Sequence, residues 1–471
     1  MGSQDLQVVP GQEWRRLSVP ALGDWEPRLR VAVILPARDC QEELDRTLAA
    51  LGRQSYPASL LEVVVVDDAS SPPLSIPSRR PSRTTLVRLD DAQSHGSGRA
   101  RHAGTEGTDA DVLLFLDADM VAERTHVEAH ARWHHVSPHA LVLGRKWFVD
   151  FTGITPADVD EASEHGDVAR CLEGRRRRGH QWQEDFIAAQ QDLGQESDDA
   201  FLAVVGATVS LRADLYRRAG GFSAFGLRGI VDTEFGYRAY TSGALLVPDE
   251  EAVAYHQGAR SFSVRGDEIK RQRTGLAANY LPIRLFRQAA VGRQWTVPIV
   301  TAVVDTAGAG AEEVQFTVDS ILASDVTDLS LTVVTHGVPL PQWLLDYWSH
   351  EARVRVTDDP QSSGFPSPVS VAVSAGLVLD ADALSRCLAL LEEHHVGVVR
   401  TRPDDLGGYG LEVWRTRALR RCGDGGPEEI SDRVAELFGE RWVQAAAFGV
   451  HVGHLRITKQ GMLVGEATPV A

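Results

Sequence analysis

An apolar run that ends in two acids constrains the fold of this chain more than any other feature. Residues 113–116 read Leu-Leu-Phe-Leu, and Asp117-Ala118-Asp119 follow directly. Four large apolar residues between polar segments are typical of a buried strand in a parallel sheet. Open α/β sheets bind ligands at the carboxyl ends of such strands, which is where these acids would lie. Side chains two residues apart in an extended chain point to the same side, so Asp117 and Asp119 would be able to hold one divalent cation.

Two earlier segments repeat the pattern of a buried strand that leads into polar residues. Residues 31–35 are followed by Pro36-Ala37-Arg38, and residues 62–66 are followed by Asp67 and Asp68. Leucines at helical spacing lie between the two segments, which indicates a strand, a helix and a second strand. This order predicts an α/β fold whose parallel strands carry their polar ends to one edge of a sheet.

Composition excludes several classes of partner and compartment. The chain of 471 residues has 48 basic and 65 acidic residues, and its formal net charge of -17 disfavours binding to nucleic acid or to an anionic membrane surface. The four cysteines are scattered without metal-like spacing, which indicates reduced thiols in a cytoplasmic protein. No apolar run reaches the length of a membrane span, and the N-terminal segment lacks a signal-peptide core. We therefore expect a cytoplasmic protein without a transmembrane segment.

Five short motifs, in one order along residues 29–258, resemble those of the family-2 glycosyltransferases. The motifs are Ile34-Leu35-Pro36-Ala37-Arg38, Val66-Asp67-Asp68-Ala69-Ser70, Ala100-Arg101-His102-Ala103-Gly104, Asp117-Ala118-Asp119 and Asp232-Thr233-Glu234-Phe235-Gly236-Tyr237-Arg238. The resemblance implies a GT-A fold, which is a Rossmann-like mixed α/β sheet, and a nucleotide-sugar donor, with a UDP-sugar favoured. His102 departs from the family pattern, which usually has Asn at this position.

The resemblance assigns the residues that would bind the nucleotide. Pro36, Ala37 and Arg38 would cradle it at the end of the first strand. Asp68 would accept a hydrogen bond from an N–H group of the base, with Asp67 as the less favoured candidate. The alternative for Asp67 is a structural role in the turn that follows the strand.

The resemblance also assigns the residues near the diphosphate and the metal. Arg101 would contact the diphosphate, since a guanidinium group matches phosphate geometry in a bidentate way. Asp119 would ligate Mn²⁺ or Mg²⁺ directly, because these cations prefer oxygen ligands. Asp117 would contact the ribose or the metal, and Ala118 lies between the two acids.

A histidine further along the chain is a second candidate metal ligand. Residues 244–247 and 252–255 are expected to form two short strands, and His256 follows them. In several relatives a histidine at this point completes the metal site, and an imidazole suits Mn²⁺. A structural role for His256 is the alternative.

The catalytic base is expected at a later acidic segment. Asp232 matches the family's base, and Glu234 is the reserve candidate. An inverting transfer needs one carboxylate that takes the proton of the acceptor hydroxyl while its oxygen attacks the anomeric carbon. Asp232 could instead be an acid that caps or starts a helix. The family usually has Glu-Asp here, whereas this chain has Val231 before Asp232.

The second half of the chain repeats several of these motifs in the same order. Leu379-Asp380-Ala381-Asp382 repeats residues 116–119, and residues 331–334 repeat residues 63–66. Self-similarity with only two copies indicates a duplicated domain and not a solenoid. The predicted organisation is an N-terminal arm at 1–28, a catalytic GT-A domain at 29–290 and a degenerate GT-A-like domain at 291–471.

The second copy lacks residues that the first copy would use. Thr335, His336 and Ala435 take the places of Asp67, Asp68 and Asp232. Asp380 and Asp382 would then remain as strand-end structure or as a vestigial cation site. We expect a non-catalytic domain that packs on the first, presents a surface to the acceptor or a partner, or supports oligomerisation. A bifunctional transferase with two donor sites is the alternative.

Other protein classes fit the sequence less well. A non-catalytic scaffold that binds nucleotide sugars would need the same fold without a functional Asp232. A nucleotidyltransferase would have a Gly-x-Gly-x-Arg loop directly after the first strand, and a dehydrogenase would have Gly-x-Gly-x-x-Gly there. The glycine-rich turn at residues 96–99 comes much later. The acceptor can be a glycan, a lipid-linked sugar or a small molecule.

Overall fold

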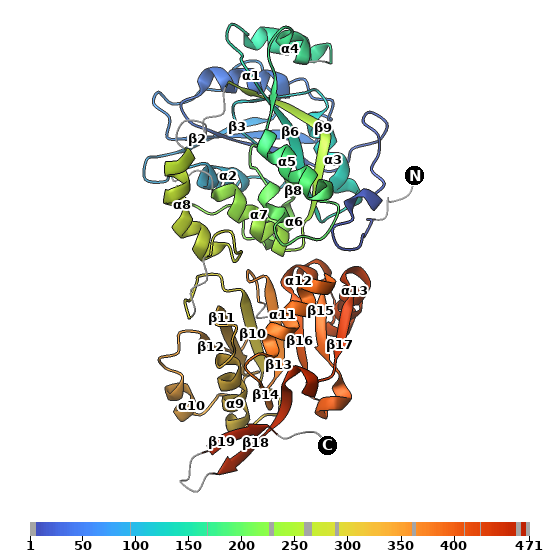
Figure 1. Ribbon diagram of the computed structural model, residues 1–471. Coiled ribbons are helices and arrows are strands. Elements are labelled where there is room, and N and C mark those ends of the chain that lie inside the picture. The colour runs from blue at the N-terminus through green and yellow to red at the C-terminus, as the bar shows by residue number, and fades with distance from the viewer. Residues whose placement is uncertain are drawn as a thin grey trace. The chain divides into compact units, whose positions relative to one another are not determined.

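Mixed β-sheets form the centres of two compact units in the computed structural model of this chain (Figure 1). The first unit comprises residues 1–240 and 244–277, and the second comprises residues 241–243 and 278–471. The described residues are 6–94, 96–166, 168–225, 230–258, 266–287, 292–359, 364–408, 410–423, 425–457 and 463–467. Within these ranges, no helix is both long and apolar enough to cross a membrane.

Four parallel strands form one half of the first sheet, in the order β3-β2-β1-β4. They are β1 (Val31–Ala37), β2 (Leu61–Asp68), β3 (Thr84–Leu89) and β4 (Val112–Leu116). Strands β1 and β4 are almost wholly buried, as their apolar sequences predict. Because β1 lies between β2 and β4, the polar residues after all three strands share one edge of the sheet.

The other half of the first sheet contains antiparallel pairs. Strand β8 pairs antiparallel with β4 and with β6, β9 pairs parallel with β6, and β5 pairs antiparallel with β9. The short β7 pairs with β6. These strands are β5 (Met120–Ala122), β6 (Ala140–Val149), β7 (Arg178–Gly179), β8 (Thr208–Arg212) and β9 (Leu245–Gln257). The resulting mixed α/β sheet confirms the expected fold class.

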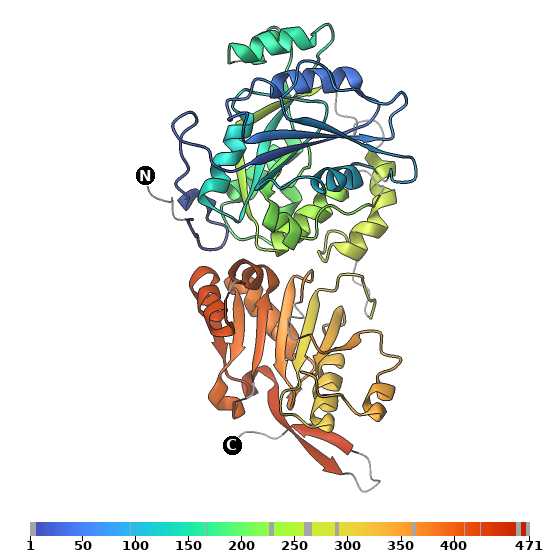
Figure 2. The same cartoon turned by 180° about the vertical axis from the view of Figure 1, so that it is seen from behind.

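Helices cover both faces of this sheet (Figure 2). They are α1 (Gln41–Leu51), α2 (Ser97–Thr105), α3 (His126–Val136), α4 (Pro156–Glu164), α5 (Gln181–Ala189), α6 (Ala213–Arg218), α7 (Val231–Thr241) and α8 (Gly266–Tyr280). Helix α1 buries Leu44 and Leu48, each worth about 1.5–3 kcal/mol when removed from water. On the opposite face α2 approaches β1 so closely that a Cβ at Gly104 would overlap Cγ2 of Ile34. This packing holds the strand ends in place.

The N-terminal segment is attached to the first unit by its two tryptophans. The ring of Trp14, in the short 3-10 helix Trp14–Arg16, meets the ring of Trp133 edge to face at 5.8 Å. The Nε1 of Trp25 donates to Oε1 of Glu128 at 3.0 Å. Both partners belong to α3, so the arm packs on that helix.

The second unit contains a seven-stranded sheet and a three-stranded sheet. The larger has the order β12-β11-β10-β13-β16-β15-β17, and the smaller has the order β14-β18-β19. The strands are β10 (Val300–Asp305), β11 (Leu329–Val334), β12 (Val354–Thr357), β13 (Val369–Ser374), β14 (Leu377–Leu379), β15 (Val398–Thr401), β16 (Leu411–Arg415), β17 (Glu440–Val443), β18 (Val450–Ile457) and β19 (Leu463–Ala467). The helices are α9 (Ala311–Leu322), α10 (Gln342–Tyr347), α11 (Ala383–His394), α12 (Thr416–Cys422) and α13 (Pro427–Phe438).

The two units have the same strand order and the same strand directions. In each, the first strand pairs parallel with the second and the fourth, β1 with β2 and β4, and β10 with β11 and β13. The fourth strand pairs antiparallel with β8 or β16, which in turn pairs antiparallel with β6 or β15. The short β5 and β14 each pair antiparallel with a late strand, β9 or β18. One chain topology therefore describes both units.

Candidate active site

The acids predicted from the sequence lie at neighbouring strand ends in the first unit. Asp67 and Asp68 close β2, and Asp117 and Asp119 follow β4. The N–H of Asp117 donates to the carbonyl of Ala207 at 3.0 Å, which joins this turn to the start of β8. The register that pairs Ala37 with Asp67 brings the end of β1 between the two acidic turns.

Asp119 and His256 form a close pair. Met120 pairs with His256 across β5 and β9, and Nε2 of His256 lies 3.2 Å from Oδ2 of Asp119. Burial raises the pKa of Asp119 to about 6, which His256 counteracts and Asp117 reinforces. The second oxygen of Asp119 and Nδ1 of His256 are buried and make no hydrogen bond to any described residue. A buried carboxylate oxygen without a donor suits a cation, so these two residues fit a divalent metal.

Asp117 points to Arg101 and not to this pair. Nη2 of Arg101 lies 2.7 Å from Oδ1 of Asp117, and Nη1 lies 2.9 Å from Oδ1 of Asp232. Among the described residues no group of three acidic, histidine or cysteine side chains is arranged to hold a metal ion. Asp119 and His256 are therefore the pair that remains as candidate metal ligands, and Asp117 is engaged with Arg101.

Arg101 is a buried bridge between two carboxylates. Only 3% of the residue is exposed, and its guanidinium group lies 5.2 Å from the ring centroid of Phe222. The sequence predicted a contact with the diphosphate for this residue. The structure instead gives both terminal nitrogens carboxylate partners, because α2 directs the side chain inward. An ion pair with so little exposure fixes the positions of Asp117 and Asp232.

Asp232 and Glu234 lie in the first turn of α7 and have different surroundings. The side chain of Asp232 is 28% exposed, whereas that of Glu234 is 3% exposed. Glu234 accepts hydrogen bonds from Ser223 at 2.9 Å and from Nη2 of Arg238 at 2.7 Å. These contacts indicate a structural role for Glu234. Asp232 retains an accessible oxygen beside the buried Arg101.

A glycine makes room for this carboxylate. A Cβ at Gly206 would lie 2.5 Å from Oδ1 of Asp232 and 2.7 Å from Cζ of Arg101. Any side chain at this position would displace the ion pair, so the approach requires glycine. The segment around Gly206 leads into β8, which joins the Asp232 side of the site to the Asp117 side.

Asp67 and Asp68, at the end of β2, differ in their hydrogen bonds. Asp67 accepts hydrogen bonds from the backbone N–H groups of Ser70 and Leu74 at 2.9 and 3.0 Å, and Arg88 lies 3.2 Å away. Burial raises the pKa of Asp67, but the hydrogen bonds and Arg88 outweigh burial and leave it below its ordinary value. Asp67 therefore holds the turn. Asp68 is 5% exposed, and its Oδ1 has no hydrogen-bond partner within the described part of the chain.

The turn that starts with Pro36 closes against β2. Arg38 donates to Oγ of Ser94 at 3.1 Å, and the N–H of Asp39 donates to Oγ of Ser70 at 2.9 Å. The loops after β1 and β2 thus support each other beside Asp68. His102 lies apart from these contacts, with Nδ1 3.0 Å from the hydroxyl of Tyr216.

Two aromatic residues of the site did not stand out in the sequence. Phe148 on β6 pairs with His256 on β9, and their ring centroids lie 4.8 Å apart. Phe222 lies under Arg101. The only sequence signal for Phe222 is the Gly220-Gly221-Phe222 turn, and Phe148 belongs to a strand whose pairing cannot be read from one sequence.

When the two units are matched strand by strand, the second unit has no acids at the corresponding turn. Matching the first residues of β4 and β13, and of β5 and β14, aligns Asp117 with Ser374 and Asp119 with Gly376. The expected match of residues 379–382 with residues 116–119 is therefore out of register. Asp380 follows β14 and Asp382 is the N-cap residue of α11, as Thr125 is of α3.

The contacts of Asp380 and Asp382 agree with this alignment. Oδ2 of Asp380 lies 3.5 Å from Nε2 of His451, on β18, and Asp382 is paired with Arg386 one turn further along α11. Asp380 aligns with Glu123, which accepts a hydrogen bond from the hydroxyl of Tyr255 on β9 at 2.8 Å. These are contacts between a strand and the loop before a helix.

The helix that contains Asp232, α7, also aligns with the second unit differently from the sequence prediction. Matching the first residues of β9 and β17 aligns Asp232 with Pro427 and not with Ala435. The expected alignment placed Ala435 opposite Asp232 from a short sequence match alone. Such a match does not take into account how many residues separate the start of the helix from the start of the following strand.

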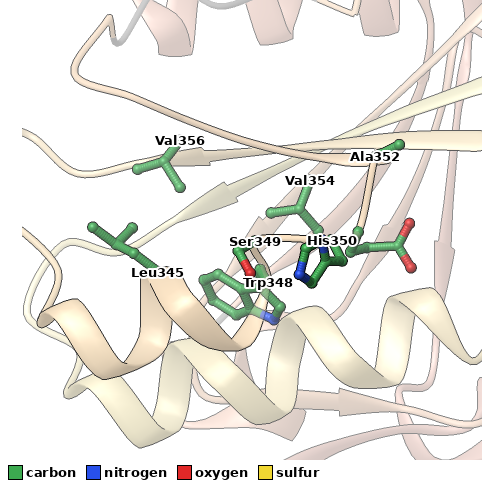
Figure 3. Close-up of a pocket in the computed structure, with 8 residues that line it drawn as sticks. Leu345, Trp348, Ser349, His350, Ala352, Val354 and Val356 are labelled. Atoms are coloured by element: carbon green, nitrogen blue, oxygen red, sulfur yellow. The ribbon is translucent and has the colours of Figure 1, made fainter.

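A hollow of about 550 Å³ in the second unit is lined by residues of α10, of β12 and of the loop between them (Figure 3). Leu345, Trp348 and Val354 point into it, and Glu351, which also lines it, is paired with Arg353 at 2.8 Å. Its single carboxylate is already engaged, so this hollow lacks the set of acids found in the first unit.

Comparison with known proteins shows a family that part of the first unit resembles. Residues 32–178 match the model of glycosyl transferase family 2. The match covers less than half of the chain, and this part of the chain is similar to glycosyl transferase family 2, which is a family of sugar-transferring enzymes. This confirms the predicted family and enzyme class.

Relatives with known names are similar over part of the chain. Glycosyltransferase AglE of Haloferax volcanii is 35% identical over 91 residues, which are 19% of this chain and 30% of AglE. Validoxylamine A glucosyltransferase of Streptomyces hygroscopicus subsp. limoneus is 28% identical over 231 residues, which are 47% of this chain and 50% of that enzyme. The chain thus spans half or less of the length of these relatives.

Solved structures include a mannosyltransferase, PcManGT from Pyrobaculum calidifontis, in complex with GDP-Man and Mn²⁺. It has 18% sequence identity and a TM-score of 0.36, and the match covers 57% of this chain and 66% of that chain. Residues 1–349 of Staphylococcus aureus TarS have 14% identity and a TM-score of 0.35, with 55% and 68% covered.

Proposed function

We propose that the first unit is an inverting glycosyltransferase that moves a sugar from a nucleotide-diphosphate donor to an acceptor hydroxyl. The observation that carries the proposal is the Arg101 bridge, whose two nitrogens lie 2.7 Å from Asp117 and 2.9 Å from Asp232. The bridge links Asp117, in the turn that would bind the donor, to the candidate base Asp232, so both would act at one site. The sequence favours a UDP-sugar as the donor.

Asp119 and His256 would hold a divalent cation, Mn²⁺ or Mg²⁺. When bound, the cation supplies positive charge that stabilises the leaving diphosphate. Asp68, with its buried oxygen, would accept a hydrogen bond from the base beside Pro36-Ala37-Arg38. Asp68 closes β2, the Pro36 turn closes β1 and Asp119 follows β4, so these residues share one edge of the sheet.

Asp232 would take the proton of the acceptor hydroxyl. Its Oδ1 lies 2.9 Å from Nη1 of Arg101, which holds the carboxylate in place for the proton transfer that a general base performs. Its remaining exposed surface lets an acceptor approach. Arg101 acts here as a positioning residue, because its contacts are with carboxylates.

We also propose that the second unit is a duplicated GT-A-like domain without transferase activity. The shared strand order supports duplication. Two observations support the absence of a donor site there. Ser374 and Gly376 take the places of Asp117 and Asp119, and Thr335 and His336 take those of Asp67 and Asp68 at the end of β11. The alternative remains a bifunctional enzyme with two donor sites.

The proposed compartment is the cytoplasm, and the proposed acceptor is a glycan, a lipid-linked sugar or a small molecule. The free thiols of Cys40, Cys171, Cys387 and Cys422 support a reducing compartment.

The test is a binding and hydrolysis screen of the full chain with UDP-glucose, UDP-N-acetylglucosamine and GDP-mannose. We expect one of them to bind in the presence of Mn²⁺ and to be slowly hydrolysed, and we expect EDTA to remove both effects. If none binds with Mn²⁺ or Mg²⁺ present, the transferase assignment fails. If binding is unaffected by EDTA, the metal site fails and the donor site stands.

A further inference from the structure

Helix α5 carries two stacked aromatic rings, of which one is exposed and the other is half-buried. Trp182 and Phe186 are four residues apart, with ring centroids at 5.9 Å and an interplanar angle of 21°. Trp182 is 47% exposed, whereas most large apolar side chains of this unit are buried. A rigid, open indole face on a surface is typical of a binding position.

A chain of ring contacts connects this pair to the candidate metal ligand. The ring of Phe148 lies 4.8 Å from that of His256, and the ring of His180 lies 5.9 Å from that of Phe148. The His180 ring in turn lies 6.0 Å from that of Trp182. Trp182 is therefore fixed, through two intervening side chains, to the residue that pairs with Asp119.

The same helix is also fixed to the side of the candidate base. Nδ1 of His180 lies 3.0 Å from Oε1 of Gln183, and Nε2 of Gln183 donates to the carbonyl of Ala203 at 2.7 Å. Ala203 ends a short 3-10 helix, and three residues later Gly206 lies against Asp232. The start of α5 is thus attached to both sides of the site, next to the candidate metal ligand His256 and next to the candidate base Asp232.

We propose that Trp182 and Phe186 form the acceptor platform of this enzyme and stack on a pyranose ring of a saccharide acceptor. This inference rests on the proposed transferase function and adds its acceptor class. The apolar C–H face of a pyranose covers an aromatic ring, and its hydroxyls stay free to reach Asp232. The base and diphosphate of the donor would occupy the β1, β2 and β4 ends, which leaves the α5 side for the acceptor.

The test compares Trp182→Ala with Trp343→Ala. Trp343 is a matched control because it is 46% exposed on α10 of the second unit. The four probes are the p-nitrophenyl glycosides of glucose, galactose, mannose and N-acetylglucosamine, offered with the nucleotide sugar that the wild type hydrolyses. Acceptor KM, donor KM and the rate of donor hydrolysis in water are measured for each full-length variant. Quenching of tryptophan fluorescence reports binding of each probe directly.

We expect Trp182→Ala to raise the acceptor KM at least tenfold while donor KM and donor hydrolysis change less than twofold. Trp182→Phe should recover most of the affinity, Phe186→Ala should have a smaller effect, and Trp343→Ala should have none. Unchanged donor hydrolysis also shows that Trp182→Ala is folded.

Three results would overturn the platform. They are an unchanged acceptor KM in Trp182→Ala, an increase in donor KM in place of acceptor KM, and a wild type that binds none of the four glycosides. Failure of the transferase function itself is a different result, namely a wild type that hydrolyses no nucleotide sugar.

Discussion

Arg101 joins the two acidic sides of the candidate site through one guanidinium group. Its partners Asp117 and Asp232 lie 16 and 131 residues further along the chain, yet both are within hydrogen-bond distance of it. A lysine has the same charge but only one nitrogen, which cannot hold two carboxylates in a fixed orientation. The geometry of the arginine side chain, and not only its charge, therefore positions the candidate base.

For Arg101→Lys we expect a fall in kcat of about 100-fold, the size of effect that a displaced catalytic group produces. Because the charge is kept, the fold should remain, as checked by a thermal melt. Arg101→Gln leaves two carboxylates without a cation and should lower the free energy of unfolding by about 3–5 kcal/mol. A kcat of Arg101→Lys equal to that of the wild type would show that the bridge has no part in positioning Asp232.

The two candidate chemical roles can be separated by single substitutions. Asp232→Asn should lower kcat by about 10²–10⁴-fold, the usual contribution of a general base, and should leave donor binding intact. Asp119→Ala should abolish the Mn²⁺-dependent binding of the donor. Steady-state kinetics and calorimetric titration of the donor distinguish the two effects.

The control for these variants is Asp382→Ala. Asp382 is paired with Arg386 at the start of α11 and has no counterpart among the acids of the site. Transfer by this variant should equal that of the wild type. Equal loss in all three variants would contradict a single site.

At the scale of elements, α3 packs a row of histidines against β8. His126, His130 and His134 are four residues apart and wholly or almost wholly buried. They meet the hydroxyls of Thr208 and Ser210 at 2.7–3.1 Å. Burial lowers the pKa of His126 to about 4 and lowers that of the other two well below the ordinary value. The row is therefore neutral in the folded chain.

This row predicts a loss of stability in mild acid. The unfolded chain takes up protons on these histidines near pH 6.5, whereas His126 in the folded chain does so only near pH 4. Stability is complete above pH 6.5 and falls as the pH drops toward 4, by about 3 kcal/mol for His126 alone. Urea denaturation at pH 7.5 and 5.0 measures the fall, which should be smaller in His126→Gln. An equal fall in both proteins would contradict the assignment.

The strands could be predicted where they are buried on both faces, because burial there requires apolar residues. The apolar runs of β1, β2 and β4 have few alternatives to a central strand, so their ends and the acids after them followed from the sequence. The two short strands expected at 244–247 and 252–255 are instead one strand, β9, because it continues past an irregularity in its pairing with β6. The acidic residues between them only suggested a break.

The contacts of the site residues were less predictable than their positions. Arg101 belongs to a helix with several basic residues, and only the packing of α2 shows that its side chain turns inward. The same holds for Glu234, whose partner Arg238 lies one helical turn away. Sequence spacing identifies which residues reach a strand edge, but partners that come from distant segments depend on the tertiary structure.

At the scale of the whole molecule, two units of one topology raise the question of how many donor sites the chain has. The turn between β13 and β14 of the second unit has Ser374 and Gly376 in the places of Asp117 and Asp119. We expect calorimetric titration of the full chain to give one nucleotide sugar per chain in the presence of Mn²⁺, and none for Asp119→Ala. Two sites per chain, with one retained in Asp119→Ala, would establish the bifunctional alternative.

Gly376 also bears on whether the second unit could regain a metal site. Its φ is 107°, a backbone conformation that residues with a Cβ rarely adopt, whereas Asp119 has no positive φ. Replacing Gly376 by aspartate would therefore strain the turn and aim the new carboxylate elsewhere. If the units share an ancestor, the main chain as well as the side chain has diverged, and evolution back to a metal-binding turn would require several coordinated changes.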